Sequence, residues 1–354
     1  MGDYMVEEQT TLNGIKINNS KAEVAERIKR LTYSQDWTSY NLAKTNEKII
    51  AEKLLLELLD TFEVKRPIRV GAKGASLKEK IYSMFVYNYS GYSSRKCISE
   101  LKMAQERKVI TKTPHFNSIL NYFGDLETIE LIKKLILITA LPLKNVEKDF
   151  AVDSSGFSTC LFERWLNART QKVERKRHWK KCHIMIGVKS NIITSVKITE
   201  GTSNDCPELM PLAKETRGFF DLREISADKA YLSRANMEGI AELGAIPYIP
   251  FKSNSTGNAK GSFIWSRMFD YFLKNNEQYM QSYHKRSNVE TAFSMIKRNF
   301  GNNLRTKKDI SQVNEILMKC LCHNLSVLVQ ESFELGLEID LSFCAEVVLA
   351  QEQG

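Results

Sequence analysis

A chain of 354 residues is long enough for two or three domains and can bury a sizeable hydrophobic core. It carries 51 Lys and Arg against 42 Asp and Glu, a formal net charge of +9, which favours a polyanionic partner without choosing among DNA, RNA and anionic lipid. No stretch reaches the run of about 18 apolar residues that spans a membrane, and the N-terminus lacks the layout of a secretory signal. The seven cysteines include no Cys-x-x-Cys pair, which fits reduced thiols. We therefore expect a cytoplasmic protein with no membrane partner.

The first part of the chain has a helical pattern up to about residue 142. We expect residues 1–19 to be a flexible terminus and residues 20–142 to form an all-helical domain. Apolar residues recur at helical spacing over residues 41–62, and Ser76 and Glu79 have the spacing of a capping box. Further helices are predicted at residues 94–106 and from Thr113, with Pro114 in the first turn.

The short segment between these last two helices, residues 107–112, is basic and carries a hydroxyl group. Such a segment between two helices favours a DNA-binding domain of the helix-turn-helix kind. A plain helical bundle has the same periodicity, so both interpretations stay open.

From residue 143 onward the pattern changes to alternating strands and helices. Strands are predicted at residues 150–154, 183–188, 192–198, 224–227 and 246–251, and helices at residues 205–215, at 233–243 and after a polar loop at 253–262. The order β-β-β-α-β-α-β-α resembles a ribonuclease H-like fold. We therefore predict an α/β protein, with a mixed sheet flanked by helices over residues 143–335 and a C-terminal tail at 336–354.

The last helical region contains the stretch with the most informative spacing, residues 283–297. It has no Gly or Pro, and its apolar residues recur at three- and four-residue steps, so we predict one amphipathic helix. At about 100° per residue, Arg286, Glu290 and Lys297 lie within roughly 60° of Tyr283. The neighbouring stripe is apolar and consists of Val289, Phe293 and Ile296. A carboxylate between two cations suits a site that holds a divalent metal and phosphates together. A solvated face with i, i+4 ion pairs is the alternative.

The spacing Tyr-x2-Arg-x3-Glu-x6-Lys, present here as Tyr283, Arg286, Glu290 and Lys297, resembles the signature of DDE transposases from bacterial and archaeal insertion sequences. The resemblance implies that Glu290 is a catalytic metal ligand. Arg286 and Lys297 are then expected to contact phosphates of DNA, and Tyr283 a phosphate or a base rather than to attack as a nucleophile.

Two further carboxylates lie at the ends of predicted strands. Asp153 is in the first strand and Asp228 ends the fourth, and in a mixed sheet of this order the first and fourth strands are neighbours. Three converging carboxylates suit Mg²⁺ or Mn²⁺, which prefer oxygen ligands. Taken singly, Asp153 reads equally as a turn residue and Asp228 as a helix N-cap.

The resemblance to the transposase family extends from about residue 146 to residue 328. Within it Asp153, Asp228 and Glu290 match the three catalytic acids. Other matching positions are Lys181, His183, Asp205, Tyr231 and the triplet His323-Asn324-Leu325. Only 290 − 228 = 62 positions separate the last two acids, so the large β-strand insertion common in the family is absent.

The resemblance further implies two divalent ions per site, hydrolysis at the ends of a mobile element and strand transfer into target DNA. It implies double-stranded DNA as partner, with a homodimer in the synaptic complex, and a nucleoid-associated place in a prokaryotic cell.

A basic segment precedes the second strand, at residues 172–181. Cations and an aromatic ring at this point favour DNA backbone contact over a solvated loop. The expected contacts are Arg175, Lys176, Arg177, Trp179, Lys180 and Lys181.

Three functions remain to be separated. The first is an active transposase, the second a nuclease of the same fold that only hydrolyses DNA, and the third a DNA-binding protein that has kept the carboxylates without catalysis. All three predict DNA binding, so only the products of a reaction distinguish them.

Overall fold

The structure is a computed structural model that describes residues 10–12, 15–17, 36–62, 74–159, 169 and 179–353. A short antiparallel pair comes first, formed by β1 (Thr10–Leu12) and β2 (Ile15–Ile17). The helices that follow are α2 (Trp37–Thr61), α3 (Leu77–Ser90), α4 (Ser94–Glu106), α5 (Phe116–Tyr122) and α6 (Glu127–Ala140). Most of the segment expected to be a flexible terminus, residues 1–19, lies outside the described residues.

The helix starts follow from side chains that satisfy free backbone N–H groups. At α3 the predicted capping box is confirmed, because Ser76 Oγ accepts from Glu79 N and Glu79 Oε2 accepts from Ser76 N. The predicted start of the next helix at Thr113 was wrong. Gln105 accepts hydrogen bonds from both the backbone N and the hydroxyl of Thr113, and α5 begins three residues later, with His115 as its cap.

The second half contains a five-stranded mixed sheet in the order β5-β4-β3-β6-β7. Its strands are β3 (Asp149–Ser158), β4 (Trp179–Gly187), β5 (Ile193–Glu200), β6 (Glu224–Ala227) and β7 (Ile246–Tyr248). The first three are antiparallel neighbours, whereas β6 and β7 run parallel to β3. The predicted adjacency of the first and fourth strands is confirmed by the pairing of β3 with β6.

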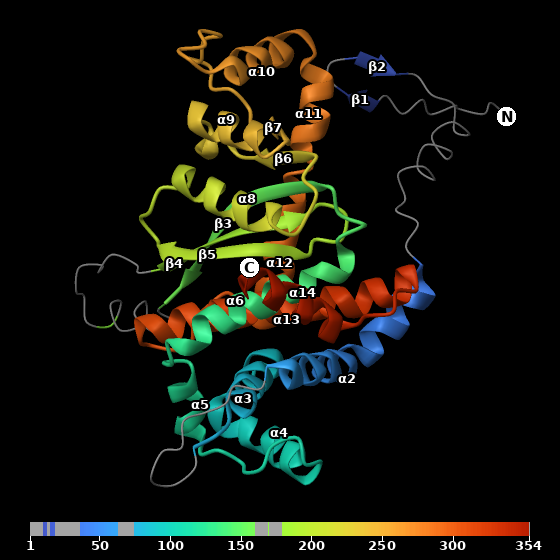
Figure 1. Ribbon diagram of the computed structural model, residues 1–354, viewed down its shortest axis with the longest axis vertical. Helices are drawn as coiled ribbons and strands as arrows, with labels where there is room; N and C mark the ends of the chain where they lie inside the picture. Colours follow the sequence, from blue (N-terminus) through green and yellow to red (C-terminus); the bar gives the residue numbers. More distant parts are fainter. Residues whose placement is uncertain are drawn as a thin grey trace, which may run out of the picture.

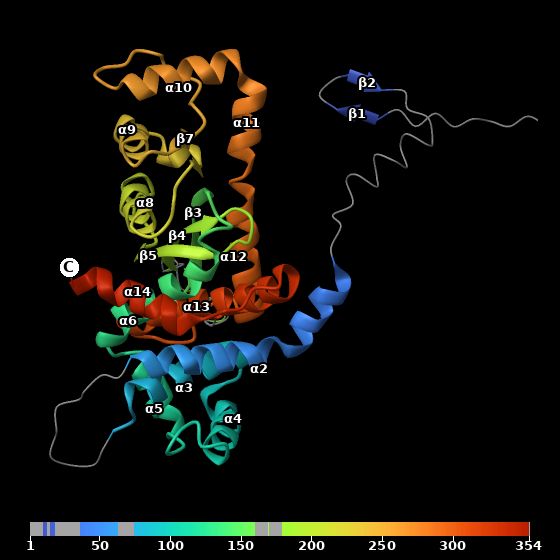
Figure 2. The same ribbon diagram turned by 45° about the vertical axis from the view of Figure 1, so that its right-hand side comes forward.

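Helices cover both faces of this sheet. The helices of this half of the chain are α8 (Leu209–Arg217), α9 (Arg234–Glu242), α10 (Phe263–Lys274), α11 (Asn276–His284), α12 (Ser287–Phe300), α13 (Asp309–Leu335) and α14 (Leu341–Gln353). Of these, α10 packs on α9 and α11 rather than on the sheet. In Figures 1 and 2, α13 lies between the sheet and α2. It is buried on all sides along residues 314–329, because it packs against α2, α6 and α3 as well as β5. The predicted fold class, a ribonuclease H-like mixed sheet flanked by helices with a helical N-terminal region, is confirmed.

The stretch predicted as one helix at residues 283–297 is divided in two. Helix α11 ends at His284 and α12 begins at Ser287, so the prediction of a continuous helix was wrong. Lys285, in the turn between them, binds Asp149 Oδ2 at 2.8 Å and Glu224 Oε2 at 2.6 Å. These two carboxylates stand at the beginnings of β3 and β6. The ion pairs hold the turn against the sheet.

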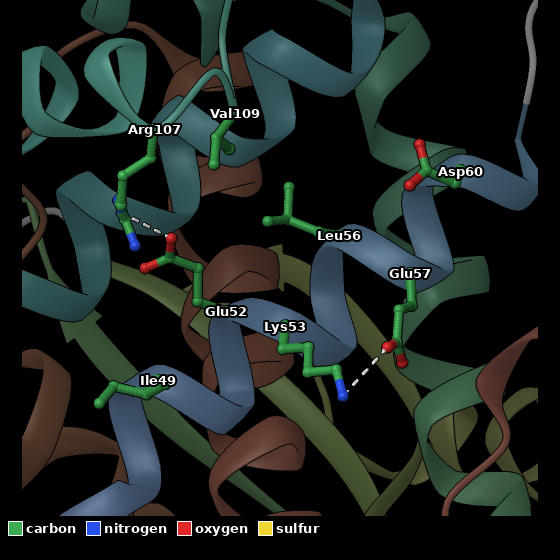
Figure 3. A pocket seen from close by; sticks show the side chains of 8 residues that line it. All are labelled: Ile49, Glu52, Lys53, Leu56, Glu57, Asp60, Arg107 and Val109. Atoms are coloured by element: carbon green, nitrogen blue, oxygen red, sulfur yellow. Dashed lines mark hydrogen bonds and ion pairs between the residues drawn. The ribbon is translucent and has the colours of Figure 1, made fainter.

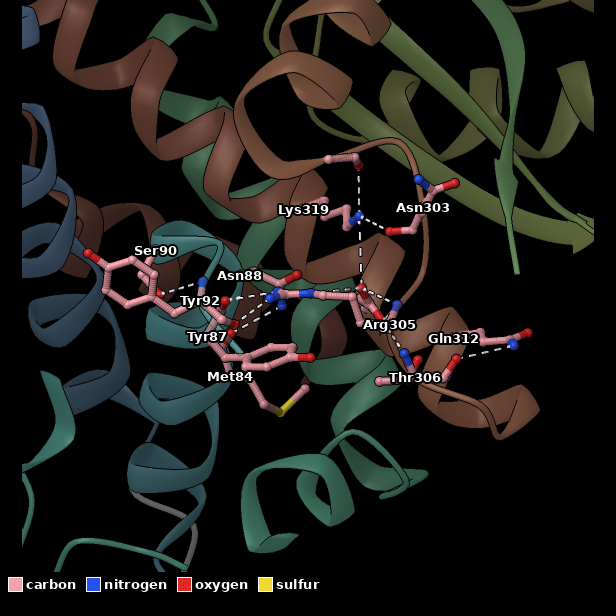
Figure 4. A network of polar contacts seen from close by, with 12 residues as sticks. Met84, Tyr87, Asn88, Ser90, Tyr92, Asn303, Arg305, Thr306, Gln312 and Lys319 are labelled. Carbon is pink, nitrogen blue, oxygen red and sulfur yellow. Dashed lines mark hydrogen bonds and ion pairs between the residues drawn. The ribbon is translucent and has the colours of Figure 1, made fainter. Parts of the chain in front are cut away.

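The helical region and the sheet domain share contacts through residues 303–319. Arg305 donates to Tyr92 O at 2.5 Å and Tyr87 O at 2.9 Å, and its guanidinium lies 3.7 Å from the centre of the Tyr87 ring (Figure 4). Glu315 is fully buried and accepts from the backbone N of Arg305. The segment after α12 is thereby fastened both to α13 and to the end of α3.

The C-terminal residues, expected to be a tail, form helix α14. Its Leu341, Ala345 and Val348 are buried, and it packs against α2 and α6. Among the helices that the structure describes, none combines the length and apolar character needed to cross a membrane.

Candidate active site

Asp153 and Asp228 leave the sheet side by side. In the parallel pair of β3 and β6, Val152 is opposite Ala227; Asp153 is the next residue within β3, and Asp228 is the first residue after β6. Neighbouring strands are about 4.8 Å apart, and residues in register point to the same face. Asp153 Oδ1 accepts from Ser154 N at 2.8 Å, whereas Asp228 Oδ1 accepts from Lys229 N at 2.6 Å and caps the short helical turn that follows.

Glu290 reaches the same edge from α12, which packs against β3. A single guanidinium links it to the sheet, since Arg286 Nη1 is 2.5 Å from Asp153 Oδ2 and Arg286 Nη2 is 2.7 Å from Glu290 Oε1. Across the residues that the structure describes, no group of three His, Cys, Asp or Glu side chains stands close enough to hold a metal ion. The position between two of the three expected ligands is held instead by Arg286.

Asp153 feels the charges of both other acids. Burial raises the pKa of this carboxyl most, and the negative charges of Asp228 and Glu290 raise it further. The Ser154 amide and Arg286 act in the opposite direction. Like charges held this close repel each other unless a cation lies between them, and Arg286 supplies such a charge here. Carboxylate oxygens are the donor type that Mg²⁺ and Mn²⁺ prefer, so the three acids suit a divalent cation by their chemistry.

Lys297 lies on the side of α12 that faces β3. Its Nζ donates to Ser155 Oγ at 2.7 Å and lies 5.3 Å from the centre of the Phe157 ring. Burial lowers its pKa. Val289, Phe293 and Ile296, predicted as the packed stripe of this helix, are buried. Tyr283 belongs to α11, is half-buried, and has the Arg286 guanidinium 5.9 Å from its ring centre.

A second polar cluster adjoins Asp153 and centres on Asp205. Its Oδ1 accepts from Ser154 Oγ at 3.0 Å and from Lys181 Nζ at 3.0 Å, and it lies 3.6 Å from Nδ1 of the buried His183. Burial lowers the pKa of His183. Sequence reasoning marked Lys181, His183 and Asp205 as matching positions but did not bring them together. The local sequence signal for this cluster was Ser154, the hydroxyl residue directly after Asp153, which binds Asp205.

The basic segment before β4 is described only in part. Arg175, Lys176 and Arg177 lie outside the described residues. Lys180 is buried and forms ion pairs with Glu200 and Asp309, and Lys181 is occupied by Asp205 and Ser203 O. Both ammonium groups have acidic partners within the protein, so a contact with DNA would have to replace these ion pairs.

Trp179 remains accessible at the start of the same strand. It is 40% exposed, and its Nε1 donates to Gly201 O at 3.1 Å. Its ring faces solvent beside the edge that carries Asp153.

A surface groove of about 290 Å³ lies elsewhere, on α2 (Figure 3). Its charged lining consists of Glu52, Glu57, Asp60, Lys53 and Arg107. Both cations are already paired, Lys53 with Glu57 and Arg107 with Glu52. With three carboxylates against two paired cations, this groove is unsuited to nucleic acid.

A mixed sheet of this order, with one acid within its central strand, a second directly after the parallel neighbouring strand and a third on the helix packed against them, defines the ribonuclease H-like class of nucleic acid enzymes. The chain belongs to the Transposase DDE domain family, whose model matches residues 144–325. It is therefore a DNA transposase.

Two known proteins are similar over most of the chain. One is a probable transposase for the insertion sequence element ISA1214 of Archaeoglobus fulgidus, 22% identical over 309 residues, which covers 86% of this chain and 92% of the relative. The other is a piggyBac transposase, solved as a synaptic complex with hairpin DNA. It is 10% identical and has a TM-score of 0.41 over 85% of this chain and 80% of that one.

Proposed function

We propose that this transposase cuts DNA at the ends of an insertion sequence and joins the freed ends to target DNA at a site formed by Asp153, Asp228 and Glu290. The observation that carries the proposal is the shared guanidinium: Arg286 binds Asp153 and Glu290 at once, while Asp228 follows the neighbouring strand in register. Two acids from separate elements thus share one positive charge, and the third acid directly follows the strand next to that of Asp153.

Two Mg²⁺ or Mn²⁺ ions at this site would activate the attacking hydroxyl and stabilise the leaving oxygen. Asp153, Asp228 and Glu290 would hold these ions. The chain itself provides no nucleophile in this reaction. Its residues hold the scissile phosphate in line and bind the flanking strand.

The cations of α12 have distinct parts in the proposal. Arg286 would leave its carboxylates and turn to a DNA phosphate when DNA is bound. Lys297, which is half-buried and bound to Ser155 of β3, would contact a phosphate from the side of the sheet. Tyr283 and Trp179 would contact the bases or sugars next to the cut.

The proposed partner is double-stranded DNA, both the terminal repeats of the element and the target. The helices α3, α4 and α5, which pack together as one unit, would bind the repeats. Exposed Lys96, Lys102 and Lys108 on and after α4 support this assignment. Two copies of the chain would pair the two ends, in the cytoplasm of a prokaryotic cell at its nucleoid.

Product analysis tests the proposal. The protein is incubated with Mn²⁺, a supercoiled plasmid and labelled duplexes that span the DNA on either side of its gene. We expect labelled ends joined to the plasmid. Cuts without joining would indicate a nuclease, and neither product, despite binding, would indicate a DNA-binding protein without catalysis.

A further inference from the structure

The segment between β7 and α10 carries cations and no acids. Residues 243–269 contain Lys252, Lys260 and Arg267 and no Asp or Glu. All three are exposed, and none forms an ion pair with any residue of the described chain. The carboxylate of Glu238 on α9 accepts a hydrogen bond from Ser262 Oγ at the end of the loop, and the unpaired lysines give the rest of the loop a positive charge.

The backbone of the same segment is turned so that its carbonyl groups face the protein. The carbonyls of residues 256 and 257 accept from Trp265 Nε1 at 2.8 Å and Ser266 Oγ at 2.7 Å. Those of residues 258 and 259 accept from Arg234 Nη2 at 3.0 Å and Nε at 3.2 Å. Four successive carbonyls are thus held by α9 and α10.

The N–H groups of these peptides consequently point the other way. C=O and N–H of a trans peptide are opposed, and the described chain contains no cis bond. The N–H groups of residues 257, 258 and 259 have no partner among the described residues, and Lys260 N donates to Asn258 Oδ1 at 3.2 Å. A row of outward N–H groups beside cations is a binding surface for anions.

This conformation is held at a cost. Lys260 has φ +43, in the left-handed region that residues with a side chain rarely adopt. Gly257 sits so close to α10 that a Cβ atom would meet the Phe269 ring at 2.9 Å. Such strain in an exposed loop is expected where the backbone contacts a ligand.

The loop stands at the edge of the sheet that carries the catalytic aspartates. β7 is parallel to β6, so the chain after Tyr248 emerges at the same edge as Asp228. Arg234, which binds the loop, begins α9 only six residues after Asp228. In Figures 1 and 2, α10 lies at the end of the molecule opposite α4 and α5, with the sheet between them.

We propose that the loop of residues 252–261 binds backbone phosphates of DNA that runs past the catalytic edge, on the far side from the N-terminal helices. Lys252 and Lys260 supply charge, and the N–H groups of residues 257–259 supply directed hydrogen bonds. The inference rests on the proposed function only in taking DNA as the polyanion.

The test measures how DNA affinity depends on salt, in EDTA so that cleavage plays no part. Lys252→Gln with Lys260→Gln removes two charges from the loop. Lys144→Gln with Lys189→Gln is the matched control, because both lysines are exposed and lie at the opposite edge of the same sheet. Asn258→Asp adds a negative charge while keeping the acceptor for Lys260 N. The probes are a random-sequence duplex and duplexes from either side of the gene.

We expect the loop double variant to lower the slope of log K against log salt by about 1.8, at about 0.9 per phosphate contact, and the control to leave it unchanged. Asn258→Asp should weaken binding severalfold at low salt with an unchanged melting temperature. A loss confined to the random duplex would assign the loop to target DNA, and a loss confined to the gene-flanking duplexes would assign it to the element ends. An unchanged slope on every probe, or an equal fall in the control, would overturn the inference. Since no catalysis is measured, failure of the metal-site proposal would leave this result intact.

Discussion

At the scale of single residues, the feature that governs the site is the competition for two carboxylates. Arg286 satisfies Asp153 and Glu290 in the absence of other cations, and in doing so it offsets the repulsion that Asp228 adds. A charge placed among acids in this way stabilises the free protein and also opposes any metal that must replace it. Arg286 is thus both a part of the site and a competitor for it.

The three acids are expected to be individually indispensable. Asp153→Asn, Asp228→Asn and Glu290→Gln each keep the shape of the side chain and remove the charge that a divalent cation needs. We expect loss of cleavage with DNA affinity nearly intact, measured by product gels and by binding in the same buffer. A variant that cuts at a rate comparable to the unaltered protein would remove that residue from the metal site.

Replacing Arg286 by Ala should alter metal binding without DNA present. Asp153 and Glu290 then repel each other, so we expect the free energy of unfolding in EDTA to fall by about 1 kcal/mol, which a lower melting temperature would report. Mn²⁺ affinity, measured by calorimetry, should rise roughly fivefold because the cation no longer displaces a guanidinium. Arg298→Ala, an exposed position near the other end of α12, is the control. Weaker Mn²⁺ binding by the Arg286 variant would contradict this account.

At the scale of elements, α13 is the support on which the sheet is held. His323 Nε2 donates to Asn191 O at 2.9 Å, and Asn324 bonds to both the N and the O of Ile193. These contacts join the middle of α13 to the turn between β4 and β5. The triplet His323-Asn324-Leu325, which matches the family, therefore stabilises the packing of α13 on the sheet and does not lie beside Asp153.

This junction should make stability depend on pH. Burial lowers the pKa of His323 from 6.5 to about 4, so the folded state favours the neutral ring. As pH falls below 6.5, the unfolded chain takes up a proton that the folded chain does not, and stability is lost progressively until about pH 4. Between pH 6.5 and 5 the loss should be about 2 kcal/mol. Urea unfolding of the protein and of His323→Gln at both pH values measures it, and equal losses in the two proteins would refute the assignment.

The accuracy with which the sequence predicted the fold differs from element to element. The strand at 224–227 and the helix at 94–106 were predicted to the residue, because alternation, helical periodicity and capping residues are local signals. The break at Lys285 was missed because its cause, the carboxylates Asp149 and Glu224, is distant along the chain. For the same reason the ion pairs of Lys180 with Glu200 and Asp309 were not predicted.

At the scale of the whole molecule, the helical region and the catalytic domain are joined through Arg305 and its neighbours. The segment that follows α12 pairs with the end of β3, since Leu304 N donates to Ser158 O at 2.8 Å. Arg305, the next residue, binds the end of α3 (Figure 4). A single stretch of chain therefore touches the strand of Asp153, the helix of Glu290 and the proposed repeat-binding unit.

Arg305→Ala should loosen this junction. It removes charged hydrogen bonds to two carbonyls and the contact with the Tyr87 ring, and we expect a loss of about 2–4 kcal/mol of unfolding free energy. Chemical denaturation measures the loss, and Lys307→Ala, exposed on the same segment, is the control. A change no larger than that of the control would show that the junction depends on other contacts.

The amino-acid sequence by itself determined the class of the fold, because periodicity is a property of neighbouring residues, and it predicted that the first and fourth strands are adjacent. Through the spacing of Tyr283, Arg286, Glu290 and Lys297 and the resemblance it carries, the sequence also supplied the three acids that we propose for the site. Only the tertiary structure decided which cations are free. Arg286 pairs with the distant Asp153 as well as with Glu290 on the adjoining helix, and Lys180 and Lys181 pair with acids far away in the chain. Lys252 and Lys260 form no ion pair with any described residue and lie on a loop whose carbonyls are held inward. The physical reason is that charge pairing depends on distance in space, which local patterns do not encode.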